Sequence, residues 1–216
     1  MILLAIGTAA RAGAQSNTPQ HDSSAAAAPA DGFPFSPWTK VFSLEGGFAH
    51  FSSGRLPGNI QSFNLGAGIA VMPFGVTRFR FLHGALDGAL ELGVEPTFAR
   101  FIPPKQNFAG LAFGFRYNLV HFSYGPFVPW IAASIAPGGS DLNIGTVSGG
   151  TRLTGPFLAL VRGEAGVSYF VGAHGAIYVG LQGEHFSNGS LNGYSSRNFS
   201  LNTPLGGVFG VSWYFH

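Results

Sequence analysis

Residues 111–119, Leu-Ala-Phe-Gly-Phe-Arg-Tyr-Asn-Leu, carry large apolar or aromatic side chains at the odd positions and small or polar ones at the even positions. Successive side chains of a β-strand point to opposite faces. The stretch therefore predicts a strand with one apolar face and with Arg116 and Asn118 on the other. An alternating run of about ten residues has the length of a strand that crosses a bilayer at a tilt.

About eight such segments follow one another from Phe42 onward, separated by turn-rich stretches. In all but one, the apolar side chains share one parity, and the acids and arginines within the segment lie on the other. The exception is the uncharged segment around 127–135, which contains Pro129 and follows Pro126, so its facing stays ambiguous. The chain ends in an alternating segment that finishes Trp213-Tyr214-Phe215-His216, and this ending resembles the assembly signal of outer-membrane barrels.

Composition narrows the fold class further. Only 9% of the 216 residues are charged, and mean hydropathy is +0.26. No apolar run after the N-terminal leader reaches the roughly eighteen residues of a transmembrane helix. A membrane protein without such helices must be a closed barrel, and 33 glycines and 22 phenylalanines suit many short strands with aromatic girdles. We predict an all-β fold, an eight-stranded antiparallel transmembrane β-barrel of the outer membrane of a Gram-negative bacterium.

The N-terminus predicts export. An apolar run, 2–10, is followed by Ala12-Gly13-Ala14, which predicts a signal peptide over 1–14, cut before Gln15. The basic residues that open such a leader are missing, which leaves the true start open. Residues 15–37, rich in Ala, Ser and Pro, predict a disordered tail, and 38–216 the barrel. A soluble β-sandwich would show the same alternation with its apolar parity buried, but the leader, the terminal aromatics and the scarcity of charge favour the membrane.

An eight-stranded barrel is only wide enough inside for side chains. The inward charges therefore predict a satisfied polar core rather than a conducting pore, formed by Glu45, Glu91, Glu164, Glu184, Arg116 and Arg162. With both termini in the periplasm, the longer links fall outside, at 52–62, 98–107, 137–155 and 188–200. The shorter turns near 72–84, 121–126 and 171–175 fall inside.

A polar pair breaks the apolar parity. His185 and Ser187 continue the parity of Leu181, so they face lipid at the outer end of the seventh segment. A serine beside a base is an activated nucleophile. The bare motif is nevertheless weak, because His-x-Ser also occurs at 50–52 and 121–123. At a membrane rim, His and Ser also meet headgroups without any catalysis.

The longer context is more specific. The stretches 184–191 (Glu-His-Phe-Ser-Asn-Gly-Ser-Leu) and 198–202 (Asn-Phe-Ser-Leu-Asn), followed by the last strand, resemble the C-terminal region of the PagL-type lipid A 3-O-deacylases and acyloxyacyl hydrolases. The resemblance implies an eight-stranded barrel that hydrolyses the ester of the 3-hydroxyacyl chain of lipid A, without a metal or other cofactor. It implies Ser187 as nucleophile, His185 as general base, and Asn188 and Gly189 near the oxyanion.

Two features depart from that family. The residues after Ser187-Asn188 are Gly189-Ser190 rather than a small residue followed by Gly. Known members also place a Glu downstream to orient the histidine, whereas no acid follows Glu184 here. Asn202 aligns best with that position, and an Asn can hold an imidazole tautomer, although it stabilises the imidazolium less than a carboxylate does.

Asn202 lies on the inward parity of its strand. It would need a β-bulge near Pro204, Gly206 and Gly207 to face outward. Glu184 is adjacent to the histidine in sequence, but it faces the lumen.

Three functions stay open. The first is a serine esterase acting on lipid A, with lipid A and outer-membrane lipids as its partners. The second is a non-enzymatic barrel, structural or adhesive, favoured by the missing acid. The third is a periplasmic lipid-binding barrel, which would need the apolar parity to face inward. A net charge of +2 gives no argument for nucleic acid, and the sequence leaves open whether the chain forms a homodimer.

Overall fold

The computed structural model describes residues 32–51, 60–81, 84–102, 105–141, 143–145, 152–154, 157–187 and 200–216. The predicted signal peptide 1–14 and most of the predicted tail 15–37 lie outside these residues. Side chains are described for slightly fewer positions, ending at Phe186 on one side of the last link and resuming at Leu205 on the other.

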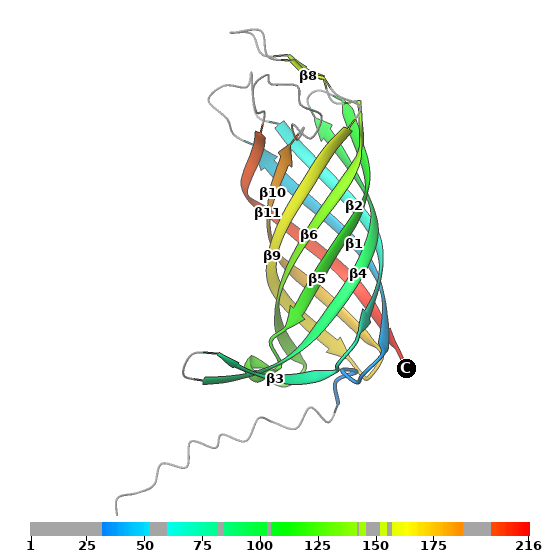
Figure 1. Ribbon diagram of the computed structural model, residues 1–216, viewed down its shortest axis with the longest axis vertical. Helices are drawn as coiled ribbons and strands as arrows, with labels where there is room; N and C mark the ends of the chain where they lie inside the picture. The colour runs from blue at the N-terminus through cyan, green and yellow to red at the C-terminus, as the bar shows by residue number, and fades with distance from the viewer. Residues whose placement is uncertain are drawn as a thin grey trace, which may run out of the picture.

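Eight long strands form the barrel wall: β1 (Thr39–Phe51), β2 (Ile60–Met72), β4 (Gly84–Ile102), β5 (Gln106–Asn118), β6 (Phe127–Ser140), β9 (Phe157–Val171), β10 (Gly175–Ser187) and β11 (Ser200–Phe215). Each pairs antiparallel with the next in the chain, and β1 pairs with β11 to close the wall (Figure 1). The predicted fold class is confirmed.

Shorter elements join the long strands. They are β3 (Val76–Phe81), β7 (Asn143–Gly145), β8 (Arg152–Thr154) and a 3-10 turn, η1 (Val120–Phe122). In the described part of the chain, no helix is long and apolar enough to span a membrane.

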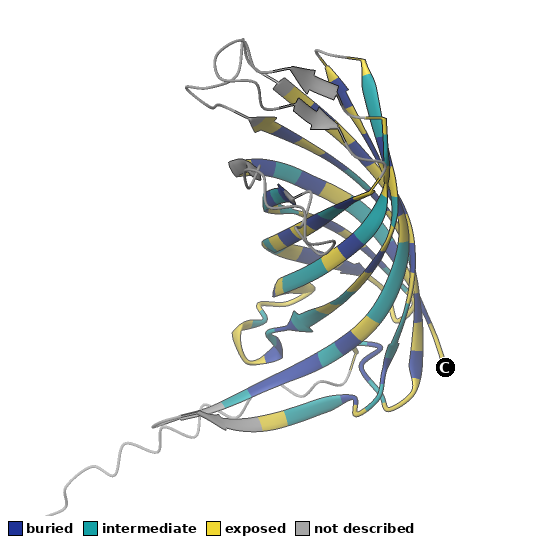
Figure 2. Cartoon of the chain, turned by 45° about the horizontal axis from the view of Figure 1, so that its top comes forward, coloured by how far each residue is buried: buried dark blue, intermediate teal, exposed yellow. Residues whose placement is uncertain are grey.

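The predicted facing of the strands is confirmed. Buried and exposed residues alternate along each long strand (Figure 2). In β10, Ile177, Val179 and Leu181 are exposed, while Tyr178 and Gln182 are buried. The structure also settles the ambiguous fifth strand, β6.

Within β6, Phe127, Ile131 and Ile135 face outward, and Val128 and Trp130 face the lumen. Pro129 lies near the start of the strand, where it pairs with Val167 of β9 and its carbonyl accepts a hydrogen bond from the Leu119 amide (2.8 Å).

The outward face is apolar across the middle of the wall, and its charged or polar residues Lys40, His50, Arg100 and His185 lie near the strand ends. Leu65 and Leu181 are 66% and 57% exposed, which would be unfavourable for a wall in contact with water. Exposed aromatic side chains ring the rim at which both termini lie: Trp38, Phe74, Phe122, Tyr124, Phe127, Tyr169, Trp213 and Phe215. An apolar band bordered by an aromatic girdle is the exterior of an outer-membrane barrel.

Several predicted links are shorter than expected or contain strands. The predicted link 137–155 begins inside β6, which runs to Ser140, and it contains the paired strands β7 and β8. The predicted external link 98–107 is too long, because β4 runs to Ile102 and β5 begins at Gln106. The turn 72–84 contains β3, which pairs with the start of β4 from Val76 to Phe81. This hairpin projects from the rim that carries the termini (Figure 1), where added ladder bonds satisfy backbone groups beyond the wall.

Apolar clusters fill both ends of the lumen. Near the outer rim, Phe186 packs edge-on against Phe101 and Phe108, with ring centroids 5.0 and 5.5 Å away. At the other rim, Phe35 contacts the rings of Phe170 and Tyr214. Phe35 precedes β1 and is buried, so the packed chain begins before residue 37, the end predicted for the disordered tail. Its apolar ring lies in the mouth of the barrel instead of in water.

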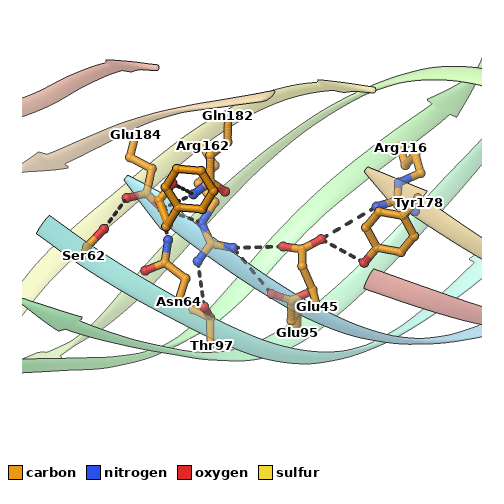
Figure 3. Close-up of polar contacts among 11 residues, drawn as sticks. Glu45, Ser62, Asn64, Glu95, Thr97, Arg116, Arg162, Tyr178, Gln182 and Glu184 are labelled. Carbon is orange, nitrogen blue, oxygen red and sulfur yellow. Dashed lines mark hydrogen bonds and ion pairs between the residues drawn. The ribbon is translucent and has the colours of Figure 1, made fainter. Parts of the chain in front are cut away.

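Between the two clusters lies a polar layer centred on Arg162 (Figure 3). The Arg162 guanidinium contacts three carboxylates, Glu45 (3.5 Å), Glu95 (3.5 Å) and Glu184 (3.2 Å). It also donates a hydrogen bond to Thr97 Oγ1 (2.9 Å). Because its side chain is only 3% exposed, these contacts replace water as its solvation shell.

A second arginine completes the layer. Arg116 lies 3.7 Å from Glu45, and its guanidinium lies over the rings of Trp130 and Tyr178, 4.4 and 4.2 Å from their centroids. Glu91 accepts a hydrogen bond from Asn118 (2.6 Å) on the next strand. Glu164 borders a cavity of about 100 Å³ beside these groups. The six residues predicted as a polar core thus all face the lumen, and Glu95 joins them.

Removing the Arg162 side chain tests this layer. We expect Arg162→Ala to lower the free energy of unfolding by about 3–5 kcal/mol, since buried carboxylates lose their shared counter-charge. Reversible urea unfolding in lipid vesicles measures it, with exposed Arg100→Ala as a control expected to change it by less than about 0.5 kcal/mol. Equal stability of the two variants would contradict the network.

A charge on the outer wall tests the membrane assignment. We expect Leu181→Arg, at the middle of β10, to cost about 2–4 kcal/mol of folding free energy in vesicles, because the guanidinium would lie in hydrocarbon. Tyr124→Arg at the rim should cost about 0–1 kcal/mol. If both cost the same, the apolar band does not face lipid.

Candidate functional site

The candidate site lies at the outer end of β10. His185 is half-buried and lies on the same parity as exposed Leu181, whereas Phe186 beside it is fully buried in the lumen. The prediction that His185 faces lipid is confirmed by this alternation. Ser187 is the last residue of β10, and the facing of its side chain stays a prediction.

A β-bulge changes the register next to this site. Gln182 pairs with Gly206, but Glu184 pairs with Thr203, so two steps along β10 match three steps along β11. One extra residue therefore lies in β11, in the stretch 204–205, where the sequence required a bulge. As a result, Asn202 is the direct ladder partner of His185.

Local sequence explains why the ladder shifts here. Pro204 has no amide hydrogen to donate to a neighbouring strand, so it favours a bulge. Gly206 and Gly207 pass close to β1. A Cβ added at Gly206 would clash with the backbone carbonyl oxygen of Phe48, so only glycine allows this approach.

The barrel wall changes at the same level. The described pairing of β1 with β11 ends at Ala49 and Gly206, while β11 continues along β10 to the pair Ser187 and Ser200. His50 is exposed at this end of β1. The candidate site thus lies on the lipid-facing side of the wall, at the level where β11 no longer pairs with β1 but still pairs with β10.

Glu184 does not take part in this outward face. It is 2% exposed and lies inside the barrel, where Arg162 contacts it at 3.2 Å, Ser62 donates to it at 3.2 Å, and Asn64 also donates to it. The barrel wall separates this carboxylate from the lipid-facing side of β10. The prediction that Glu184 faces the lumen is confirmed.

The three His-x-Ser copies are found at different places. His185 and His50 lie at the outer ends of β10 and β1, with β11 between these two strands. His121 lies in η1, at the rim that carries the termini, so its copy is remote from the other two. Ser52, Asn188 and Gly189 lie outside the described residues, and the role expected for Asn188 and Gly189 remains a prediction.

One neighbour was not singled out from the sequence. Ser200 pairs with Ser187 across the last hairpin. Alternation alone gives the faces of each strand but not the register between strands, so it cannot find such a partner. Pro204, Gly206 and Gly207, at or next to the bulge, are the residues from which a change of register could be suspected.

The chemistry available here is that of a base and a hydroxyl two residues apart on one strand. Over the described ranges, no group of three or more His, Asp or Glu side chains is arranged to hold a metal ion. The imidazole of His185 is a side chain that can accept a proton near neutral pH. An amide directly across the ladder from it, that of Asn202, is a group able to fix an imidazole tautomer once it faces the ring.

Comparisons with known proteins give likenesses of fold. No family model matches the sequence, and no curated protein matches it. The outer membrane enzyme PagL is 18% identical, with 82% of this chain and 99% of that chain covered and a TM-score of 0.44. The N-terminal β-barrel domain of Pseudomonas aeruginosa OprF is 14% identical, with coverages of 83% and 98% and a TM-score of 0.45.

A third solved structure, Neisserial surface protein A, is 14% identical, with coverages of 81% and 95% and a TM-score of 0.48. Likenesses this distant carry no argument about activity, and the resemblance to the PagL-type family is not established by them. The closed wall, the apolar band and the aromatic girdle are observed in the chain itself. The chain is an eight-stranded β-barrel of the Gram-negative outer membrane.

The shifted register can be tested by cross-linking. The chain has no cysteine, so an introduced pair reports only on itself. We expect His185→Cys with Asn202→Cys to form a disulfide on mild oxidation, because directly opposed Cα atoms lie about 4.5–5.5 Å apart, within the range of a disulfide. His185→Cys with Thr203→Cys should stay reduced. Cross-linking of only the second pair, read by gel mobility of the folded barrel, would contradict the bulge.

Proposed function

We propose that the chain is an outer-membrane serine esterase that removes the ester-linked 3-hydroxyacyl chain from lipid A, with Ser187 as the nucleophile and His185 as the general base. The observation that carries the proposal is the position of His185. A base on the lipid-facing side of the wall, at the outer end of β10, lies at the leaflet in which lipid A is found.

The ladder supports Asn202 as the third member of the site. In the proposed arrangement, the Asn202 amide holds the imidazole of His185 in the tautomer whose other nitrogen accepts the serine proton. The register, with Asn202 opposite His185, favours this role over one for Glu184. Because an amide carries no charge, it stabilises the imidazolium less than a carboxylate would, and we expect a slow enzyme.

The reaction then follows the usual course of acyl transfer. Ser187 Oγ attacks the ester carbonyl while His185 accepts its proton, and the backbone amides of Asn188 and Gly189 donate to the tetrahedral oxyanion. Collapse releases the 3-hydroxyl of the lipid A sugar, which takes the proton from His185. Water, activated by His185, then hydrolyses the acyl-enzyme to the free hydroxy acid and restores Ser187.

A second candidate is a non-enzymatic barrel with a structural or adhesive role. The observation that favours it is the engagement of Glu184 with Arg162, Ser62 and Asn64 inside the barrel, on the other side of the wall from the lipid-facing parity of His185. No acid follows Glu184 in the sequence. On this alternative, His185 would meet only lipid headgroups.

Mass spectrometry of lipid A distinguishes the two candidates. We expect lipid A from cells that make the wild-type chain to lose one hydroxyacyl chain, and lipid A from cells that make Ser187→Ala to keep it. Loss of the nucleophile alone should lower the rate by more than about a thousandfold. Heat-dependent gel mobility checks that both proteins fold. Identical lipid A from both cultures, with both barrels folded, would leave the non-enzymatic candidate.

Substitution of Asn202 gives a second test, in which activity is expected to be kept or raised rather than lost. We expect Asn202→Glu to keep or raise the deacylation rate, because a carboxylate stabilises the imidazolium of His185. The rate is followed in detergent micelles with purified lipid A. Should Asn202→Glu abolish activity in a folded barrel, Asn202 does not serve His185.

A further inference from the structure

A second candidate site lies on the outer wall near the rim that carries the termini. A groove of about 650 Å³ crosses β1, β2, β4 and β5, with Phe215 of β11 at its edge. Two rows of outward side chains form its walls, and the ladder pairs their members across strands. One row contains Lys40, Val71 and Leu92, and the other contains Phe42, Ile69 and Val94, with Phe113 beside it.

The floor of the groove is made by the row between these walls. Val41, Ala70, Gly93 and Gly114 lie there, and their side chains point to the lumen or are absent. Gly93 also packs closely against β2 on the lumen side, where a Cβ added to it would lie 2.9 Å from the Cβ of Ala70. On the lipid side, the groove therefore has a backbone floor with large apolar side chains standing along both edges.

Lys40 is the one charged residue among those that line the groove. It is exposed, and as the second residue of β1 it lies at the membrane surface on the side of the termini, with Val71 and Phe215 as its ladder partners. A lysine on a lipid-facing wall extends its ammonium to the interface, where an anion is its natural partner. The groove thus combines a long apolar trough with a single cation at its polar end.

We propose that this groove binds one anionic phospholipid of the periplasmic leaflet. An acyl chain lies in the trough between the two rows, and the lipid phosphate accepts a hydrogen bond from Lys40 Nζ. The volume is that of a small-molecule site, for which about 300–1,000 Å³ is typical. This site is independent of the proposed esterase, because it lies in the other leaflet and shares no residue with His185, Ser187 or Asn202.

Tryptophan quenching by brominated lipid measures this binding. Trp213 stacks on Phe42 at the edge of the groove, with ring centroids 5.7 Å apart. In the full chain with Trp38→Phe, Trp213 becomes the lipid-facing reporter, since Trp130 is buried in the lumen. The protein in detergent is titrated with phosphatidylglycerol, and separately with phosphatidylcholine, each brominated on one acyl chain.

We expect phosphatidylglycerol to quench Trp213 at lower concentration than phosphatidylcholine does. Lys40→Gln should raise the half-quenching concentration of phosphatidylglycerol about fivefold and leave that of phosphatidylcholine unchanged. Val71→Phe, which fills the groove, should raise both. Arg100→Gln, an exposed cation near the opposite end of the barrel, is the matched control and should change neither.

Three results would overturn the proposal. In the first, the two lipids quench Trp213 equally in the Trp38→Phe chain that is otherwise unchanged, so that no headgroup is selected. In the second, Lys40→Gln or Val71→Phe behaves as Arg100→Gln does in a barrel shown to be folded by its gel mobility. In the third, the wild type sediments as a dimer that Val71→Phe dissociates, which would make the groove an interface between copies of this chain.

Discussion

The structure depends on one constraint, that no backbone amide or carbonyl is left unpaired inside a bilayer. The pairing of β1 with β11 meets this constraint, because it converts a sheet with two open edges into a closed wall. In a closed wall, every strand has one face toward lipid and one toward the lumen. Alternation sends one parity of each strand to lipid and the other to a lumen too narrow for bulk water.

The same alternation places Glu184 and His185 on opposite sides of the barrel wall. Glu184 and His185 are neighbours in the chain, yet one belongs to the interior network around Arg162 and the other faces lipid. The acidic residue nearest to the histidine is thus committed to the stability of the barrel. On the neighbouring strand, the bulge in β11 makes Asn202 the ladder partner of His185, and we propose Asn202 as the residue that orients the imidazole.

Much of this was accessible from the sequence. The eight strands, the inward charges and the outward His185 follow from a period of two, which any half-buried strand obeys. Register does not follow from it, because it depends on long-range pairing across the barrel. From the sequence, one could predict that Asn202 would face outward only if β11 contained a bulge, but not that the bulge is present. The pairing of Ser200 with Ser187 was missed for the same reason. The sequence pattern also missed β3 and the end of β4, where the exposed Pro96 and Arg100 interrupt the apolar parity.

The most direct test of the account is chemical labelling of the purified, folded barrel with a serine-reactive fluorophosphonate that carries an acyl tail, followed by peptide mass spectrometry. The account predicts a single adduct, on Ser187. The adduct is lost in His185→Ala and kept in Glu184→Gln, because His185 lies on the lipid-facing side of β10 whereas Glu184 lies in the lumen. An adduct that survives His185→Ala, or labelling of Ser200 in place of Ser187, would contradict it.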